Sequence, residues 1–352
     1  MKCLFLSARR YSISNSIVRG FIENNWEVNV CDYEDFFSES RNRFVSQMNF
    51  LPNRLKSWWW RPYINTINRT YLDIFYRYSP DIVLIYNNQH VSPETLVTFK
   101  ERARIAFFLG DNPLYSPTSI NNIHILQYAD YIICPDSMWK EQLEKMGIKN
   151  VKLDFLGFDE SVYHPFQPTG DLKSIYNSDF VYIGHAHLSG WGYKRFLFLN
   201  HFSDFNIKIF LVGSGYDKYW FKFFPKLRDK IIMPGNKDRY NQKFSNLIYN
   251  CSKIGPVELV PSYFNGIHPR VFELLGSGIF PLCEYSRDLE MVFSGLNVPF
   301  IKNYDEIKDI AEYLLRNDDL RAQLISGMRQ RIMDLYRPEK VISRLIDAVV
   351  RV

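Results

Sequence analysis

The chain is organised around short apolar runs that alternate with loops and helical patterns. In the N-terminal half these runs cover Lys2–Ser7, Trp26–Cys31, Asp81–Tyr86, Arg104–Leu109 and Tyr131–Cys134. Continuous apolar runs of this length are typical of strands buried on both faces of a parallel sheet. Because strands and helices alternate along the chain, we predict a βαβ arrangement and a doubly wound α/β domain.

The same alternation continues in the C-terminal half, with strand-like runs at Phe180–Ile183, Ile207–Val212, Ile254–Val260 and Ile279–Cys283. A chain of 352 residues is long enough for two domains of ordinary size. The Pro- and Gly-containing segment Pro165–Asp171 is the predicted linker. We therefore predict an α/β protein with two Rossmann-like domains, in residues 1–165 and 166–340, and a terminal helix in residues 341–352.

Composition narrows the class of protein further. The chain is 46% apolar and 16% aromatic, which favours a large core over extensive disorder. Its net charge of +5 suits phosphorylated ligands or an anionic membrane surface, and is too small to indicate nucleic acid. The five cysteines lack C-x-x-C spacing, so we expect buried free thiols in a reducing compartment. No apolar run approaches the length of a membrane span, and we expect a cytoplasmic protein.

Polar residues follow the predicted strands of the N-terminal half at their carboxyl ends, where doubly wound folds bind ligands. Asn87 to His90 follow one strand, and Gly110-Asp111 follow the next. Asp111 and His90 are therefore candidate catalytic acid/base or acceptor-binding groups. The alternatives are a turn cap for Asp111 and a structural role for His90.

A polar, basic loop follows the first predicted strand. Its candidate acceptor-binding residues are Arg9, Arg10 and Ser12, and Asn88 is a fourth candidate from a neighbouring strand end. The alternative for Arg9 and Arg10 is a solvated basic loop.

Aromatic and basic residues are concentrated between Arg41 and Ser79, where we expect one or two helices. Trp58-Trp59-Trp60-Arg61 is the densest part of this segment. Such a mixture suits contact with sugar rings or lipid headgroups, and the alternative is an aromatic core helix with an exposed tryptophan. If the protein contacts the inner face of a membrane, we expect the contact here.

The segment Pro261–Glu284 reads as a loop, a short helix and a strand. Pro269 suits the first position of the helix, and Arg270 and Glu273 share one face near its N-terminus. A helix N-terminus beside a guanidinium favours a phosphate, and a carboxylate one turn further can accept hydrogen bonds from sugar hydroxyls. A local ion pair between Arg270 and Glu273 is the alternative.

The segment also resembles a known family. Pro-Ser, a Gly-containing loop, R-x-F-E and then G-x-G-x-x-P is similar to the nucleotide-sugar signature of GT-B glycosyltransferases. The resemblance is closest to the CgeB-like, glycosyl transferases group 1 pattern, which is family 4-like. It implies two domains facing across a cleft and a terminal helix that returns to the N-terminal domain.

The resemblance also implies a donor site. By this resemblance Glu273 holds the ribose, and the turn Gly276–Gly278 lets the backbone approach the diphosphate. The remaining implied donor-binding residues are Arg270, Lys194, Arg195, Gly184, His185, Gly213, Gly235, Asn265 and Ser277. Asn265 stands where many retaining relatives carry a second glutamate, so the stereochemical outcome stays open.

His185 and His187 have spacing that allows a metal pair, but the sequence offers no third ligand. The family generally needs no metal, so we expect no metal and no cofactor. The expected activity is hexosyltransferase-type: a sugar moves from a nucleotide-diphosphate-sugar to a glycan, lipid-linked or small-molecule acceptor, as in polysaccharide biosynthesis. Two alternatives stay open: a sugar-nucleotide epimerase on the same fold, and a non-catalytic surface or spore-maturation protein.

Overall fold

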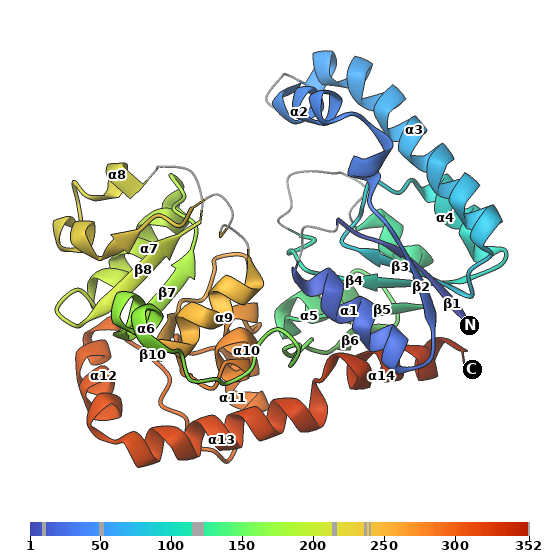
Figure 1. Ribbon diagram of the computed structural model, residues 1–352. Helices are drawn as coiled ribbons and strands as arrows, with labels where there is room; N and C mark the ends of the chain where they lie inside the picture. Colours follow the sequence, from blue (N-terminus) through green and yellow to red (C-terminus); the bar gives the residue numbers. More distant parts are fainter. Residues whose placement is uncertain are drawn as a thin grey trace. The chain divides into compact units, whose positions relative to one another are not determined.

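The computed structural model describes residues 1–8, 12–48, 53–114, 123–212, 217–235, 238 and 241–350. Its contacts divide the chain into two compact units (Figure 1). Unit 1 comprises Met1–Leu156 and Pro338–Val352, and unit 2 comprises Gly157–Arg337. Residues 157–165, which the sequence-based division assigns to the first domain, lie in unit 2, and residues 338–340 lie in unit 1.

Unit 1 is built on a six-stranded parallel sheet with the order β2-β1-β3-β4-β5-β6. Its strands are β1 (Lys2–Leu6), β2 (Glu27–Cys31), β3 (Ile82–Tyr86), β4 (Arg104–Phe108), β5 (Tyr131–Cys134) and β6 (Val151–Leu153). Its helices are α1 (Ser12–Glu23), α2 (Glu39–Met48), α3 (Asn53–Tyr78), α4 (Pro93–Lys100), α5 (Ser137–Lys145) and α14 (Pro338–Val350), with 3-10 turns at Tyr33–Phe36 and His124–Tyr128. The apolar runs predicted as N-terminal strands thus form this sheet.

The terminal helix α14 completes the core of unit 1. It packs against α1, and its apolar face contributes Val341, Ile342 and Leu345 to the same cluster as Ile17 and Phe21 (Figure 1). Burial of this apolar stripe stabilises the helix in that position. The predicted return of the terminal helix to the N-terminal part of the fold is confirmed.

Unit 2 is built on a five-stranded parallel sheet with the order β11-β10-β7-β8-β9. Its strands are β7 (Ser178–Gly184), β8 (Ile207–Leu211), β9 (Ile231–Ile232), β10 (Ser252–Val257) and β11 (Phe280–Cys283). Its helices are α6 (Gly170–Tyr176), α7 (Gly190–Asn200), α8 (Asp217–Trp220), α9 (Gln242–Asn250), α10 (Pro269–Gly276), α11 (Arg287–Val292), α12 (Ile307–Arg316) and α13 (Asp318–Leu335), with 3-10 turns at Pro225–Lys230 and Tyr304–Glu306. Pro281, which cannot donate to a ladder, lies in the edge strand β11, where a sheet tolerates it.

The two doubly wound α/β units confirm the predicted fold class. Within the described parts of the chain, no helix combines the length and apolar character that crossing a membrane would need.

Candidate functional site

Helix α10 is the element around which unit 2 arranges its candidate site. His268 caps it: the imidazole Nδ1 accepts a hydrogen bond from the backbone N–H of Arg270 at 3.1 Å. The backbone N–H of Val271 is bonded to the His268 carbonyl at 2.9 Å, and Pro269 has no N–H. The first backbone donors of the helix are therefore occupied within the protein. A phosphate at this end has to be bound mainly by side chains.

His268 itself supplies such a donor. Because its Nδ1 accepts a hydrogen bond, the proton of the neutral ring is on Nε2. Burial, followed by the charge of Arg270, lowers the pKa of His268 to about 3, so the ring stays neutral at physiological pH. His268 was not among the predicted site residues. The His-Pro-Arg order at the start of the predicted helix is the sequence signal that could have indicated it, because this order is compatible with a capping side chain before a proline at N1.

Arg270 pairs with Glu258 and not with Glu273. Its Nη1 lies 3.0 Å from Oε2 of Glu258, which directly follows β10 and is fully buried. Arg195, from α7, donates to the other oxygen of the same carboxylate, with Nε 2.6 Å from Oε1. The hydroxyl of Tyr182, from β7, donates to Oε1 at 2.8 Å. Three elements of the sheet and its helices therefore meet at one carboxylate.

The Glu258 cluster carries an excess of positive charge. Burial alone would raise the pKa of Glu258, but Arg270 and Arg195 hold it at about 2, so the carboxylate is ionised. Two guanidinium groups then face the single negative charge of Glu258, and Glu273 is a second carboxylate that acts on Arg270. The side chains of both arginines are almost fully buried, and the guanidinium of Arg270 lies over the Tyr182 ring, 4.3 Å from its centroid. Both guanidinium groups are thus committed to contacts within the protein.

Glu273 lies one turn into α10 and is held by tyrosine hydroxyls. The hydroxyl of Tyr249, from α9, donates to its Oε2 at 3.2 Å, and Tyr163 donates to the same carboxylate. Burial raises the pKa of Glu273, while Arg270 and the two phenols act in the opposite direction. The carboxylate is thus fixed in orientation and remains partly exposed, which suits an acceptor of hydroxyl hydrogen bonds.

The turn after α10 is determined by packing. A Cβ on Gly276 would lie 2.7 Å from side-chain atoms of Phe158 and Tyr163, so only glycine fits. Gly278 has φ of 79°, a left-handed conformation that favours glycine. The Ser277 hydroxyl donates to the Asn246 side chain at 2.7 Å. These residues hold the end of α10 against α9 and the loop before α6.

The carboxyl end of β7 brings Gly184 and His185 to the same cluster. Arg195 donates to the backbone carbonyl of His185, and burial, followed by Arg195, lowers the pKa of the His185 ring. The next histidine, His187, stacks on Trp191 with ring centroids 4.4 Å apart. Burial, followed by Arg195, lowers the pKa of His187 to about 4. In the described parts of the chain, no three His, Cys, Asp or Glu side chains are grouped as a metal site would require.

The remaining candidates of unit 2 make other contacts. Lys194 donates to Glu284 at 2.8 Å and to the carbonyl of Leu259 at 2.6 Å, so it joins the ends of β10 and β11. Asn265 lies in the loop before α10, and its carbonyl accepts from the backbone of Asp288 at 3.1 Å. Gly235 follows β9 and bonds locally to Asp238. Gly213 lies outside the described residues.

In unit 1, Asp111 and Asn87 form a linked pair at the ends of β4 and β3. The Asn87 amide donates to Oδ2 of Asp111 at 2.7 Å, and its oxygen accepts from the backbone N–H of Gly110 at 2.6 Å. The Asp111 side chain is exposed, yet the protein around it displaces enough water to raise its pKa, while the Asn87 bond lowers it. Asp111 is therefore held in place at a strand end, as its sequence position indicates.

His90 packs among aromatic rings. Its centroid lies 4.8 Å from that of Tyr33 and 5.2 Å from that of Trp60, both edge to face. Its backbone N–H donates to the side chain of Asn88 at 3.2 Å. These contacts favour the structural alternative for His90. Arg9 and Arg10 lie outside the described residues, as does the side chain of Ser12.

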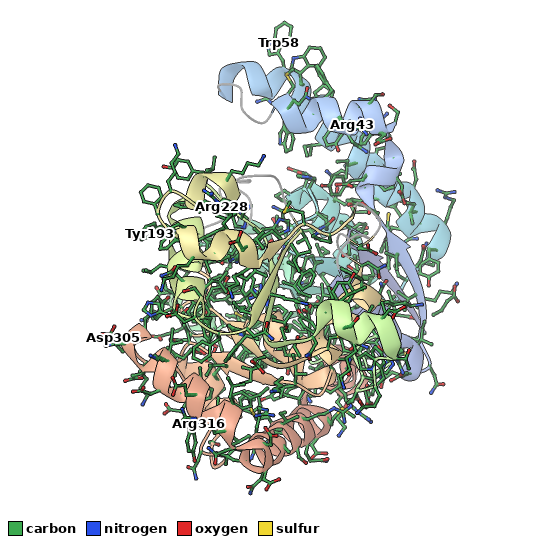
Figure 2. All side chains as sticks on the ribbon, turned by 60° about the vertical axis from the view of Figure 1, so that its left-hand side comes forward. Arg43, Trp58, Tyr193, Arg228, Asp305 and Arg316 are labelled. Carbon is green, nitrogen blue, oxygen red and sulfur yellow. The ribbon has the colours of Figure 1, made fainter. Side chains whose placement is uncertain are left out.

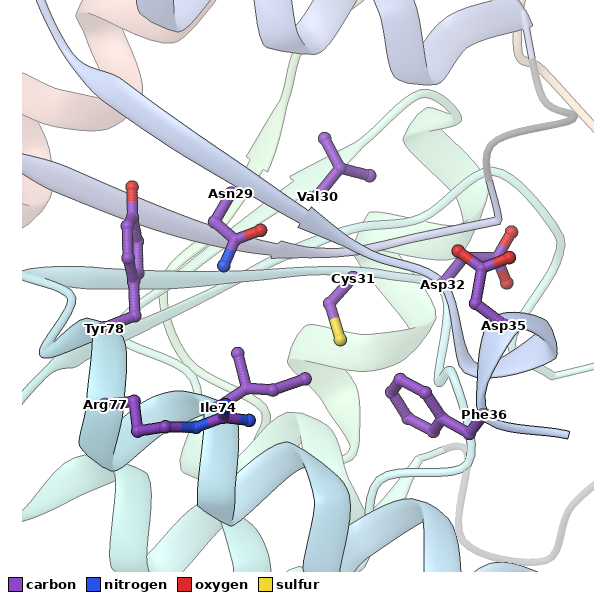
Figure 3. Close-up of a pocket in the computed structure, with 9 residues that line it drawn as sticks. All are labelled: Asn29, Val30, Cys31, Asp32, Asp35, Phe36, Ile74, Arg77 and Tyr78. Carbon is purple, nitrogen blue, oxygen red and sulfur yellow. The ribbon is translucent and has the colours of Figure 1, made fainter.

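Unit 1 also contains a pocket of about 440 Å³ beside its edge strand (Figure 3). It lies between β2 and the C-terminal end of α3, and none of the predicted site residues lines it. The lining side chains are Asn29, Val30, Cys31, Asp32, Asp35, Phe36, Ile74, Arg77 and Tyr78.

The part of the chain that contains these contacts resembles a known family. Residues 195–347, from Arg195 through Glu258 and Glu273 into α14, match the family model described as "Glycosyl transferase-like". Among solved structures, sucrose-phosphate synthase from Thermosynechococcus elongatus is similar over 98% of both chains, with 10% identity and a TM-score of 0.70. The chain has the GT-B fold of glycosyltransferases. The predicted resemblance to GT-B glycosyltransferases is confirmed.

Two further similar structures are of proteins whose descriptions include a nucleotide sugar. The E. coli trehalose-6-phosphate protein bound with UDP-2-fluoro glucose is similar over 99% of this chain and 100% of its own, with 11% identity and a TM-score of 0.67. A "putative UDP-N-acetylglucosamine 2-epimerase" from Listeria monocytogenes is similar over 98% of this chain and 96% of its own, with 13% identity and a TM-score of 0.59. A search among curated proteins finds no match to this chain.

Proposed function

We propose that the protein transfers a sugar from a nucleoside-diphosphate-sugar to an acceptor, and that unit 2 binds the donor. The observation that carries this proposal is the orientation of Glu273. Its carboxylate is held by Tyr249 and is one turn from the cap of α10. A fixed, partly exposed carboxylate is suited to the paired hydroxyls of a ribose. The bound UDP-2-fluoro glucose of the E. coli structure makes uridine the first base to test.

The diphosphate would lie at the N-terminus of α10. We propose that His268 Nε2–H donates to it and that the excess charge of Arg195 and Arg270 over Glu258 stabilises it. The same positive field would stabilise negative charge that develops on the leaving nucleotide during transfer. Because protein groups supply this charge, we propose transfer without a divalent cation. Activity that persists in excess EDTA would support this, and activity restored only by added Mg²⁺ or Mn²⁺ would contradict it.

Unit 1 would supply the acceptor side. We propose Asp111, held by Asn87, as its acid/base or acceptor-orienting group. Its raised pKa brings the carboxyl closer to the pH at which it could exchange a proton. The acceptor is a glycan, a lipid-linked sugar or a small molecule. A variant Asp111→Asn should retain donor binding and lose transfer, and unchanged transfer would remove Asp111 from the proposal.

The donor proposal is tested by thermal shift of the whole chain with UDP, GDP, ADP, CMP and dTDP. A ligand that binds only the folded state raises the melting temperature with its occupancy. We expect a shift with one of the nucleotides that is much smaller in Glu273→Gln. The substituted amide would retain an oxygen for the Tyr249 bond, so this variant should fold. The matched control is Glu312→Gln, a partly exposed ion-pair residue on α12, whose shift should equal that of the wild type.

The results of this thermal-shift test show whether the protein binds a nucleotide and whether Glu273 takes part in the binding. Equal shifts in Glu273→Gln and Glu312→Gln would exclude Glu273 from the donor site. No shift with any nucleotide would contradict donor binding and favour the non-catalytic alternative. The fold shared with the Listeria protein keeps the epimerase as the second candidate. Incubation with UDP-sugar alone distinguishes it, because an epimerase changes the sugar without an acceptor.

A further inference from the structure

The α2–α3 hairpin of unit 1 has an inner face that is fully engaged with the rest of the unit. The ring of Trp60 points inward, with its centroid 5.2 Å from that of His90 and 5.8 Å from that of Tyr63. Phe37 stacks on Tyr63 at 4.4 Å. The proposed donor site in unit 2 uses none of these residues.

The outer face of the hairpin is aromatic and uncovered. Trp58 is 84% exposed and Trp59 is 56% exposed, although both are adjacent to the inward-facing Trp60. Phe44, from α2, lies edge to face with Trp59 at 5.4 Å and is also exposed. Trp58 projects into open space at the far end of the hairpin (Figure 2). Several large aromatic side chains exposed together mark a surface that binds something.

The charge of the hairpin indicates what that surface binds. Residues 39–69 contain six basic residues and one acidic residue, Glu39, and so account for the whole net charge of +5. Among the described side chains of this segment, Arg41, Arg43 and Arg61 are exposed. Glu39 is already paired with Arg43 along α2. Arg41 lies over the ring of Phe37, 4.7 Å from its centroid, on the inner side. The exposed Arg43 and Arg61 thus share the two helices with the exposed aromatic residues.

We propose that this aromatic and basic face of the α2–α3 hairpin docks on an anionic lipid bilayer. Tryptophan and phenylalanine are favoured at the level of the headgroups, and arginine is attracted to the lipid phosphates. A second copy of the chain would present the same positive charge and would be repelled. Docking would hold the protein at a membrane surface, where a lipid-linked acceptor would be found.

The test is co-sedimentation of the full chain with vesicles of phosphatidylcholine, with and without about one third phosphatidylglycerol. We expect binding to the anionic vesicles that is roughly tenfold stronger than to the neutral ones and that weakens as salt is raised. Trp58→Ser/Trp59→Ser should lower binding to both kinds of vesicle. Arg43→Gln/Arg61→Gln should remove most of the preference for anionic lipid. Because the four side chains are exposed, the melting temperatures should stay at the wild-type value.

Matched controls lie on unit 2. Tyr313 and Met291 are exposed apolar residues, 55% and 48%, and Arg316 is an exposed arginine with the same kind of helical ion pair as Arg43. Tyr313→Ser/Met291→Ser and Arg316→Gln should bind vesicles like the wild type. The proposal is overturned if no vesicle sediments the protein, or if the tryptophan variant binds as well as these controls. A concentration-dependent dimer that is lost in Trp58→Ser/Trp59→Ser would overturn it in favour of a contact between copies. Thermal shift with nucleotides is independent of all these readouts.

Discussion

Arg270 reaches Glu258, twelve residues before it in the chain, instead of Glu273 on its own helix face. The guanidinium thereby fixes the start of α10 to the end of β10, and Glu273 is left to the tyrosines. The two carboxylates thus have different surroundings: Glu258 is fully buried between two arginines, whereas Glu273 is partly buried and accepts hydrogen bonds from tyrosines.

Replacing Glu258 should destabilise unit 2 strongly. Glu258→Gln removes the carboxylate that two buried guanidinium groups share, and the loss of one partner from a buried ion pair lowers the free energy of unfolding by about 3–5 kcal/mol. Urea unfolding of the variant measures this loss. Glu312→Gln, which removes the carboxylate partner of the exposed Arg316, should change it by less than roughly 1 kcal/mol. Equal small effects of both variants would contradict the role assigned to Glu258.

Two substitutions at His268 separate capping from ligand binding. His268→Asn retains an oxygen that can accept from the backbone N–H of Arg270, and asparagine is among the best capping residues. It should keep the melting temperature while weakening nucleotide binding, because the Nε2–H donor is lost. His268→Ala should lower both, with a loss of stability of about 0.5–2 kcal/mol. Full nucleotide affinity in His268→Asn would assign His268 to capping alone.

Nucleotide affinity should fall on acidification at a higher pH than for an ordinary glutamate. Burial raises the pKa of Glu273 above its usual 4.5, and only the ionised carboxylate can accept from both ribose hydroxyls. His268, with a pKa of about 3, stays neutral over this range and adds no inflection. Titration calorimetry with the nucleotide between about pH 8 and pH 5 checks this, and Glu273→Gln should lack the inflection.

Acidification should have the opposite effect on the contribution of Glu273 to stability. A carboxyl whose folded pKa is raised contributes stability at low pH, and this contribution is lost as the pH rises through the folded value. Protonation of Glu273 should thus weaken ligand binding without lowering the melting temperature of the free protein. Parallel losses of both on acidification would assign the effect to unfolding and contradict the prediction.

Gly276→Ala should destabilise the protein even without ligand. The new methyl group would meet Phe158 and Tyr163 at 2.7 Å, and overpacking of this kind lowers stability by about 1–3 kcal/mol. The control is Gly190→Ala at the start of α7, where nothing lies within 4 Å of an added Cβ. Thermal unfolding of the free variants gives the comparison. A normal melting temperature with lost nucleotide binding would instead support the closer backbone approach implied by the family resemblance.

Much of the fold follows from local sequence signals. Continuous apolar runs such as Asp81–Tyr86 determine parallel strands, and Pro269 and Gly278 indicate where α10 begins and the following turn lies. Prediction of the fold class therefore required only sequence patterns that extend over a few residues. The site was harder to predict from sequence, because its main contacts join segments that are far apart in the chain. Glu258 and Arg195 are 63 residues apart, and no pattern within the predicted helix indicates that Glu258 is the partner of Arg270.

His90 illustrates the same limit in unit 1. Its position at a strand end suggests chemistry, whereas its ring packs against Tyr33 and Trp60 from separate elements. The three adjacent tryptophans also differ in a way that the sequence does not indicate. Trp60 points inward, whereas Trp58 and Trp59 are exposed. Packing partners supplied by distant segments decide these cases, and a local pattern does not contain them.

The position of α14 constrains the order in which the protein can fold during synthesis. Unit 2 lies wholly between the two segments of unit 1, so it can reach its native state while the polypeptide is still being translated. Unit 1 has to wait for residues 338–350, because Val341 and Leu345 fill its core beside α1. Until residues 338–350 have left the ribosome, the apolar face of α1 stays uncovered. The first segment made is thus completed only after the whole of unit 2 has been made.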